Sequence, residues 1–142
     1  MSVIVTDAGF GSDTFRGPLL DWDVATQAGW QPPAGYGLDL PNTVTADQLR
    51  PYFDAALMRI SFPSFADGRG FTIARQLRLL GYGGQLRASG YVLADQYAMA
   101  RRCGFDAVEI DDALAQRQPQ DQWLARADWQ AHDYQARLRG AA

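Results

Sequence analysis

The sequence of 142 residues contains no lysine, one cysteine and one histidine. All 13 basic side chains are therefore arginines, whose planar donor groups suit carboxylates and oxyanions. A single cysteine, Cys103, excludes an internal disulfide and an iron–sulfur cluster held by several thiolates of this chain. We expect Cys103 to be packed rather than reactive. His132 lies in a predicted terminal helix, and one histidine argues against a histidine-based triad or zinc site.

Several functional motifs are also missing. No G-x-G-x-x-G follows a predicted strand and no Walker-type loop occurs, so nothing indicates a dinucleotide or ATP cofactor. The net charge of -3 disfavours nucleic acid and anionic membranes as partners. No apolar run approaches the roughly 20 residues of a membrane span, and MSVIVTDAG lacks the features of a secretion signal. We therefore expect a cytoplasmic protein without a cofactor or metal. Asp111 and Asp112 could bind Mg²⁺ or act in acid–base chemistry, but adjacent acids favour a solvated helix start.

The stretch 56–112 has the pattern of parallel β-α-β-α-β units. Apolar runs at 56–62, 85–89 and 107–110 predict strands, and amphipathic segments at 69–80 and 93–103, each followed by glycine, predict helices. In the first helix the residues expected to face inward are Ile73, Ala74, Leu77 and Leu80, with Arg75 and Arg78 outside. In the second helix they are Leu93, Tyr97 and Ala100. A further short strand is predicted at 38–41. The fold class expected is therefore α/β, with a four-stranded, mainly parallel sheet built from βα units.

The two flanks are expected to cover this core within a single domain. Residues 1–35 predict a covering arm with little regular structure, residues 36–112 form the βα core, and residues 113–142 are a C-terminal helical segment. Within that segment, apolar residues at three- and four-residue steps predict a helix over 121–139. All four tryptophans lie in the flanks, and packing onto the core is favoured over docking to a partner.

Each predicted strand carries one charged residue near its middle, which is unusual for a sheet covered by helices on both faces. The side-chain period of two places these residues on one face, opposite an apolar face. If the strands follow sequence order, Asp39 lies beside Arg59 and Arg87 lies beside Glu109. A sheet with one polar face resembles half of a TIM-type (β/α) barrel. The alternative is an open sheet with these charges paired near an edge.

A ligand is expected at the loops after the carboxyl ends of the strands. There, Asp67, Gly68, Arg69 and Gly70 precede a predicted helix, whose free N–H groups favour an anion. Asp67 is equally explained as a helix N-cap. The candidate oxyanion or ligand-binding residues are Asp67, Gly68, Arg69, Gly70, Arg87, Asp95 and Gln96.

Residues 57–110 resemble a bacterial family of unknown function with the motifs F-P-x-F-x-D-G-R-G, G-Y-x-G-x-L-R-A, V-L-x-D-Q and R-R-C-G-F-D-A. The matching residues are Phe62, Pro63, Phe65, Asp67, Gly68, Arg69, Gly70, Arg87, Asp95, Gln96, Arg101, Arg102, Cys103 and Asp106. Ser61 and Tyr91 stand where members often carry an acid. Members are commonly described as oxidoreductases of sulfite reduction, because their genes lie beside those of the assimilatory sirohaem sulfite reductase.

The resemblance implies an accessory, non-catalytic protein of assimilatory sulfite reduction that binds sulfite reductase or its electron donor. We expect that a protein of this composition cannot move electrons without a bound cofactor. The alternative is a small enzyme or carrier that binds an oxyanion or phosphoester through Arg69 and Arg87. A third hypothesis is a homodimer in which two half-barrels pair. Whether the protein is an enzyme stays open on the sequence.

Overall fold

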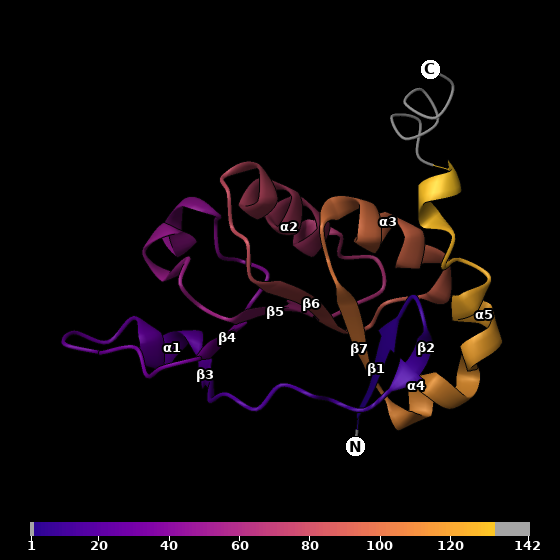
Figure 1. The fold of residues 1–142 in the computed structure, drawn as a ribbon, viewed down its shortest axis with the longest axis horizontal. Coiled ribbons are helices and arrows are strands. Elements are labelled where there is room, and N and C mark those ends of the chain that lie inside the picture. Colours follow the sequence, from indigo (N-terminus) through magenta and orange to yellow (C-terminus); the bar gives the residue numbers. More distant parts are fainter. Residues whose placement is uncertain (1, 133–142) are drawn as a thin grey trace.

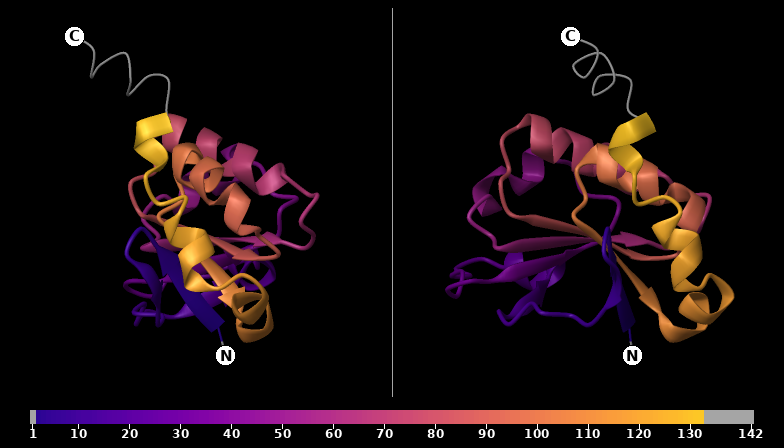
Figure 2. Two further views of the ribbon diagram at one scale, coloured as in Figure 1. Left: turned by 90° about the vertical axis from the view of Figure 1, so that its right-hand side faces the viewer. Right: turned by 45° about the vertical axis from the view of Figure 1, so that its right-hand side comes forward.

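A computed structural model describes residues 2–132, which form a seven-stranded mixed sheet with helices (Figure 1). The strand order is β2-β1-β7-β6-β5-β4-β3. Figure 2 shows that α2 and α3 lie over one face of the sheet, while the N-terminal segment passes along the other. The α/β class is therefore confirmed, but the predicted sheet of four strands is too small.

The four predicted strands form the centre of the sheet. They are β4 (Gly37–Leu40), β5 (Leu57–Phe62), β6 (Gln85–Gly90) and β7 (Ala107–Asp111). They pair in parallel and in sequence order. The connections contain η1 (Asp47–Tyr52), α2 (Arg69–Leu79), η2 (Ala94–Gln96) and α3 (Tyr97–Cys103). The predicted βα units are confirmed, and the strands lie in the sequence order on which the expected ion pairs depend.

The N-terminal arm is more regular than predicted. It contributes β1 (Ser2–Thr6), β2 (Gly9–Gly11), β3 (Leu19–Asp21) and the short helix α1 (Trp22–Ala25). β1 pairs with β7 in antiparallel orientation, and β3 pairs with β4 in parallel orientation. Two of these strands have only three residues, too few to show an alternating pattern. Because strands of the same chain occupy both edges of the four-stranded centre, half-barrels cannot pair through those edges.

The apolar face of the sheet packs against α2 and α3 to form the core. Met58, Ile60 and Phe62 of β5 are at most 2% exposed. The predicted inward residues Ile73, Ala74 and Leu77 of α2 are buried, as are Tyr97 and Ala100 of α3. At about 25 cal/mol per Å² of buried apolar surface, this layer is the main source of stability.

Arg78 was expected on the outer face of its helix, and the structure corrects this. Its guanidinium donates to the carbonyl oxygens of Gly104, Tyr82 and Gly84, at 2.8–3.0 Å. It also pairs with Asp106 at 3.0 Å. A long arginine stem allows the charged head to reach backbone groups at the amino ends of β6 and β7. Arg75, by contrast, is exposed as predicted.

The predicted C-terminal helix over 121–139 is also wrong within the described residues. The chain forms α4 (Asp112–Arg117), α5 (Gln120–Leu124), a turn, and η3 (Trp129–His132). Trp123 is 1% exposed and its indole N–H donates to the carbonyl of Gln118 at 2.9 Å. Burial of this single large ring fixes α5, and Leu124 of the predicted apolar stripe is 41% exposed. The remainder of the predicted helix lies outside the described residues.

All four tryptophans contact other parts of the domain, as predicted. Trp22 packs edge-to-face on Tyr52, and Trp30 packs on Tyr36. Trp123 packs on Tyr97, and the Arg101 guanidinium lies 4.9 Å from the Trp129 ring centroid. Among residues 2–132, the structure contains no helix with both the length and the apolar character needed to cross a bilayer.

Candidate functional site

The polar face of the sheet carries the predicted charged row, defined as Asp39, Arg59, Arg87 and Glu109. Asp39, Arg59 and Arg87 are direct register partners on β4, β5 and β6. Glu109 of β7 is the register partner of Ser89, which follows Arg87 as the next residue of β6 on the same face. Because side chains alternate between faces, the buried apolar residues between these charges point to the opposite side.

The charged row is a connected network rather than two separate pairs. Arg59 donates to both carboxylate oxygens of Asp39, at 3.1 and 2.9 Å. Arg87 donates to Glu109 at 3.0 Å, so both predicted ion pairs are present. Arg59 also donates to Glu109, at 3.2 and 3.3 Å. Glu109 therefore links the two arginines, which would otherwise repel one another across adjacent strands.

A fifth residue, Asp13, completes the network from the N-terminal arm. Its carboxylate accepts hydrogen bonds from both terminal nitrogens of Arg87, at 3.0 and 3.1 Å. These hydrogen bonds and the positive charge of Arg87 hold the pKa of Asp13 below its usual value. The sequence analysis missed Asp13, because it lies in a turn-rich segment with no regular pattern.

Burial explains why the charges of the row must be matched. The side chains of Arg59, Glu109 and Arg87 are 21%, 12% and 2% exposed. An unpaired charge at such positions costs several kcal/mol, whereas a hydrogen-bonded pair is tolerated. Hydrogen bonds to Asp39 raise the pKa of Arg59, although burial opposes this. The row is therefore an ion network in which each charge has a partner of opposite sign.

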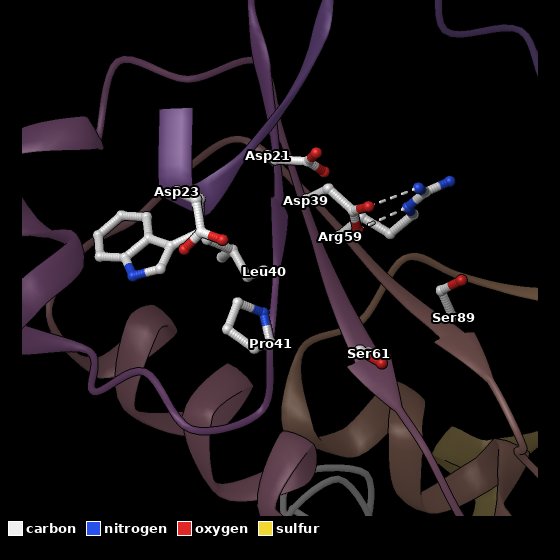
Figure 3. A pocket seen from close by; sticks show the side chains of 9 residues that line it. Asp21, Asp23, Asp39, Leu40, Pro41, Arg59, Ser61 and Ser89 are labelled. Carbon is white, nitrogen blue, oxygen red and sulfur yellow. Dashed lines mark hydrogen bonds and ion pairs between the residues drawn. The ribbon is translucent and has the colours of Figure 1, made fainter. Parts of the chain in front are cut away.

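An open pocket of about 350 Å³ adjoins the row at the carboxyl ends of the strands (Figure 3). Ser61 and Ser89, register partners on β5 and β6, lie along one side of it. Figure 3 shows the Asp39–Arg59 pair beside Asp21, and Asp23 on the opposite side. The remaining lining residues are Trp22, Leu40 and Pro41.

The pocket has an acidic character. Three carboxylates, from Asp21, Asp23 and Asp39, face one guanidinium, from Arg59. Asp39 and Arg59 neutralise each other, while the carboxylates of Asp21 and Asp23 have no hydrogen bond or ion pair within residues 2–132. This balance favours a cationic or hydroxyl-bearing group over an anion. Within the described residues, no group of three histidine, cysteine or acidic side chains could hold a metal ion.

The predicted anion site at the start of α2 is organised around its own carboxylate. Asp67 accepts from the side-chain amide of Asn42 at 2.8 Å and from the backbone N–H of Arg69 at 3.3 Å. The hydrogen bond from Asn42 is the main cause that lowers the pKa of Asp67. The Arg69 side chain is 65% exposed and lies 3.5 Å from Asp67. Asp67 thus caps the backbone where an external anion was expected.

The two glycines of this segment have structural roles. Gly68 is the N-cap residue of α2. A Cβ added at Gly70 would lie only 2.5 Å from the Phe62 ring, so glycine permits close packing of the helix on β5. Arg87, the remaining cation of the predicted set, shares no partner with Arg69. The structure therefore separates these two arginines.

The side chains of Asp95 and Gln96 contact other loops of the chain and form no hydrogen bond or ion pair with Arg69 or Arg87 within residues 2–132. Asp95 pairs with Arg126 at 2.8 Å. The Gln96 side chain accepts from the Leu93 N–H at 2.8 Å and donates to the Phe65 carbonyl at 3.2 Å. Gln96 therefore joins the loop after β5 to the loop after β6.

These joined loops present a group of exposed apolar side chains, which we call the loop-edge surface: Phe65, Tyr91 and Leu93. They are 37%, 47% and 37% exposed. The rings of Phe65 and Tyr91 pack edge-to-face, with centroids 5.4 Å apart. Sequence analysis missed this surface, and Leu93 was expected to face inward. The only sequence signal was the occurrence of large apolar residues in two loops that follow neighbouring strands.

Comparisons with known proteins complete the description of the chain. A family profile, described as a bacterial protein of unknown function (DUF934), matches residues 37–142. Neither curated proteins nor solved structures gave a match. The matched region contains the charged row, the loop-edge surface and most of the pocket, but not Asp13, Asp21 or Asp23. The chain therefore belongs to the DUF934 family of bacterial proteins of unknown function.

Proposed function

We propose that this protein is an accessory protein of assimilatory sulfite reduction that binds sulfite reductase or its electron donor through the loop-edge surface. The observation that carries this proposal is the group of exposed apolar side chains held on hydrogen-bonded loops. In this proposal the electrons pass through cofactors of the partner, and the chain itself is not the catalyst.

The loop-edge surface has the chemistry of a protein-binding site. Aromatic residues are enriched among the side chains that dominate binding energy at interfaces. Phe65 and Tyr91 form an edge-to-face pair, so their side chains lose less conformational entropy when a partner binds. The hydrogen bonds of Gln96 to both loops restrict the backbone in the same way.

The acidic pocket adds a specificity element at the same end of the strands. Ser61 and Ser89 line the pocket, and the chain continues from them into the loops that carry Phe65 and Tyr91. Asp21 and Asp23 supply two carboxylates without a partner within residues 2–132. A partner with an apolar patch next to an arginine or lysine would complement both features.

The link to sulfite reduction rests on the family resemblance and its gene neighbourhood. The family resemblance supports the identity of the partner, and the exposed apolar side chains of the loop-edge surface support a binding role. The alternative, an oxyanion held jointly by Arg69 and Arg87, has less support, since these two residues share no partner.

The experiment is affinity capture of the tagged full chain from its own host grown on sulfate, with mass spectrometry of the bound fraction. We expect enrichment of sulfite reductase or its electron donor. The enrichment should be lost in the Phe65→Ser, Tyr91→Ser double variant. Leu79→Ser is the matched control, because Leu79 is 79% exposed on α2 and does not belong to the loop-edge surface. Equal capture by the wild type and the double variant, or no sulfur-assimilation protein in either, would overturn the proposal.

A further inference from the structure

The Arg87 guanidinium has one donor that the network leaves unused. The side chain is 2% exposed, and its terminal nitrogens bind Asp13 and Glu109. Its Nε atom is buried and has no hydrogen-bond partner. A buried, unsatisfied donor on a charged group costs free energy, so its presence calls for a physical explanation.

One of the two carboxylates that pair with Arg87, that of Asp13, lies outside the family-matched region. Asp13 lies in the N-terminal arm, whereas the match spans residues 37–142. Within that span, Asp39 and Glu109 balance Arg59 and Arg87, and Asp13 brings a third carboxylate to two guanidiniums. The Asp13 side chain is itself 42% exposed. The arm therefore places a carboxylate on a guanidinium to which the matched region supplies one carboxylate, that of Glu109.

A cavity of about 520 Å³ adjoins this contact. Arg87 lines it together with Ser12 and Thr14, the residues on either side of Asp13. Gln85 and Thr6 add an amide and a hydroxyl. The hydroxyls of Ser12 and Thr14 have no hydrogen-bond partner within residues 2–132. The cavity thus combines a buried cation with polar groups that suit a small anion.

We propose that Arg87 and this cavity form a binding site for a small oxyanion, either a carboxylate or an inorganic oxyanion such as sulfate or sulfite, and that Asp13 is its internal occupant. Two oxygens of such a ligand would replace the two carboxylate oxygens of Asp13 on the terminal nitrogens of Arg87. Guanidinium groups bind carboxylates and related oxyanions through the same paired hydrogen bonds. The arm would then be displaced from Arg87 when the ligand binds.

The neighbouring acidic groups are compatible with an anion, because each has a partner. Glu109 is held by Arg59 and Arg87. Asp106 lines the cavity, but its carboxylate accepts from Arg78 and from the backbone N–H of Leu86. Exchange of Asp13 for a bound monoanion keeps the charge balance around Arg87 unchanged.

Removal of Asp13 provides the test. The full chain and its Asp13→Ala variant are titrated with acetate, sulfate and sulfite while the ¹⁵N–¹H signal of Arg87 Nε is followed by NMR. We expect at least one anion to bind Asp13→Ala about tenfold or more tightly than the wild type, with a shift of the Arg87 signal. Acetate alone identifies a carboxylate site, while sulfate or sulfite identifies an inorganic oxyanion site. Asp13→Asn, which keeps the shape of the side chain, should show the same gain.

Two controls separate this site from a general charge effect. Asp47→Ala removes the same charge from an exposed ion pair with Arg50 and should give no gain in affinity. The Tyr91→Ser variant should bind anions as the wild type does, because the site does not depend on the loop-edge surface. Equal affinity in wild type and Asp13→Ala, or no shift of the Arg87 signal in any variant, would overturn the proposal.

Discussion

Arg59 and Arg87 occupy directly paired positions on adjacent parallel strands, and both donate hydrogen bonds to Glu109. Like charges in paired positions normally destabilise a sheet. Here Asp39 and Asp13 flank the arginines on their outer sides, so each guanidinium lies between two carboxylates. The polar face therefore depends on Glu109 more than on any other single side chain of the row.

The first prediction concerns this central carboxylate. Replacement of Glu109 with glutamine keeps the shape but removes the charge, which leaves two neighbouring guanidiniums with one fewer counter-ion. We expect the free energy of unfolding to fall by about 3 kcal/mol, measured by urea denaturation. Asp47→Asn, in an exposed pair, should cost less than about 0.5 kcal/mol. Similar losses in the two variants would contradict the network.

A second prediction compares two arginines of α2. Arg78→Met should lower the free energy of unfolding by about 3 kcal/mol, because it leaves three backbone carbonyl groups without this donor and removes one of the partners of Asp106. Arg75→Met changes an exposed side chain of the same helix and should have little effect. The two variants are compared by thermal and urea unfolding. If Arg75→Met is as damaging as Arg78→Met, the role assigned to Arg78 is wrong.

The third prediction concerns the turn after β6. Gly90 has a φ of +119°, and a Cβ added there would lie 2.6 Å from the backbone oxygen of Phe62. Gly81 has a φ of +100° but no atom within 4 Å of such a Cβ. Gly81→Ala should cost about 1 kcal/mol from backbone conformation alone, and Gly90→Ala clearly more. Equal costs by urea denaturation would show that the close approach to Phe62 does not matter.

Asp7 gives a prediction about pH. Burial raises the pKa of Asp7, but hydrogen bonds from Tyr97, Trp129 and Arg101 outweigh this and hold it below the ordinary value of 3.8. A carboxyl group with a lower pKa in the folded state stabilises the fold above its unfolded pKa. This contribution is lost as the pH falls through the folded value.

We therefore expect Asp7→Asn to be less stable than the wild type at pH 7, with a difference that shrinks below about pH 4. Urea denaturation across this pH range measures the difference. Asp23→Asn is a suitable control, since the Asp23 carboxylate has no partner within residues 2–132. A difference for Asp7→Asn that stays constant with pH would contradict this assignment.

The sequence was sufficient to predict the centre of the fold. Apolar runs of four to seven residues, separated by amphipathic, glycine-terminated segments, identify βα units, and their alternation places Arg59 and Arg87 on one face. Both predicted ion pairs follow from sequence order of the strands, which is the usual arrangement for neighbouring βα units. These features depend on local periodicity, which a single sequence contains.

The other features depend on contacts between distant segments. Asp13 and Arg87 are 74 positions apart, and nothing in the sequence around Asp13 specifies that pairing. The three-residue strands β2 and β3 have no periodicity to detect. The loop-edge surface requires Phe65 and Tyr91 to approach across two loops, which Gln96 controls by hydrogen bonds that the sequence does not reveal. The arrangement at the start of α2 depends on a distant residue in the same way, because Asn42 directs the Asp67 carboxylate to the start of this helix.

The proposed docking role is tested most directly by equilibrium binding of the purified full chain to purified sulfite reductase, and separately to its electron donor, from the same organism. Isothermal titration calorimetry should give a complex with one of them in the micromolar range. Tyr91→Ser should weaken it about tenfold or more, and Leu79→Ser should leave it unchanged. No heat of binding with either protein, or an affinity that Tyr91→Ser does not alter, would contradict the docking role of the loop-edge surface.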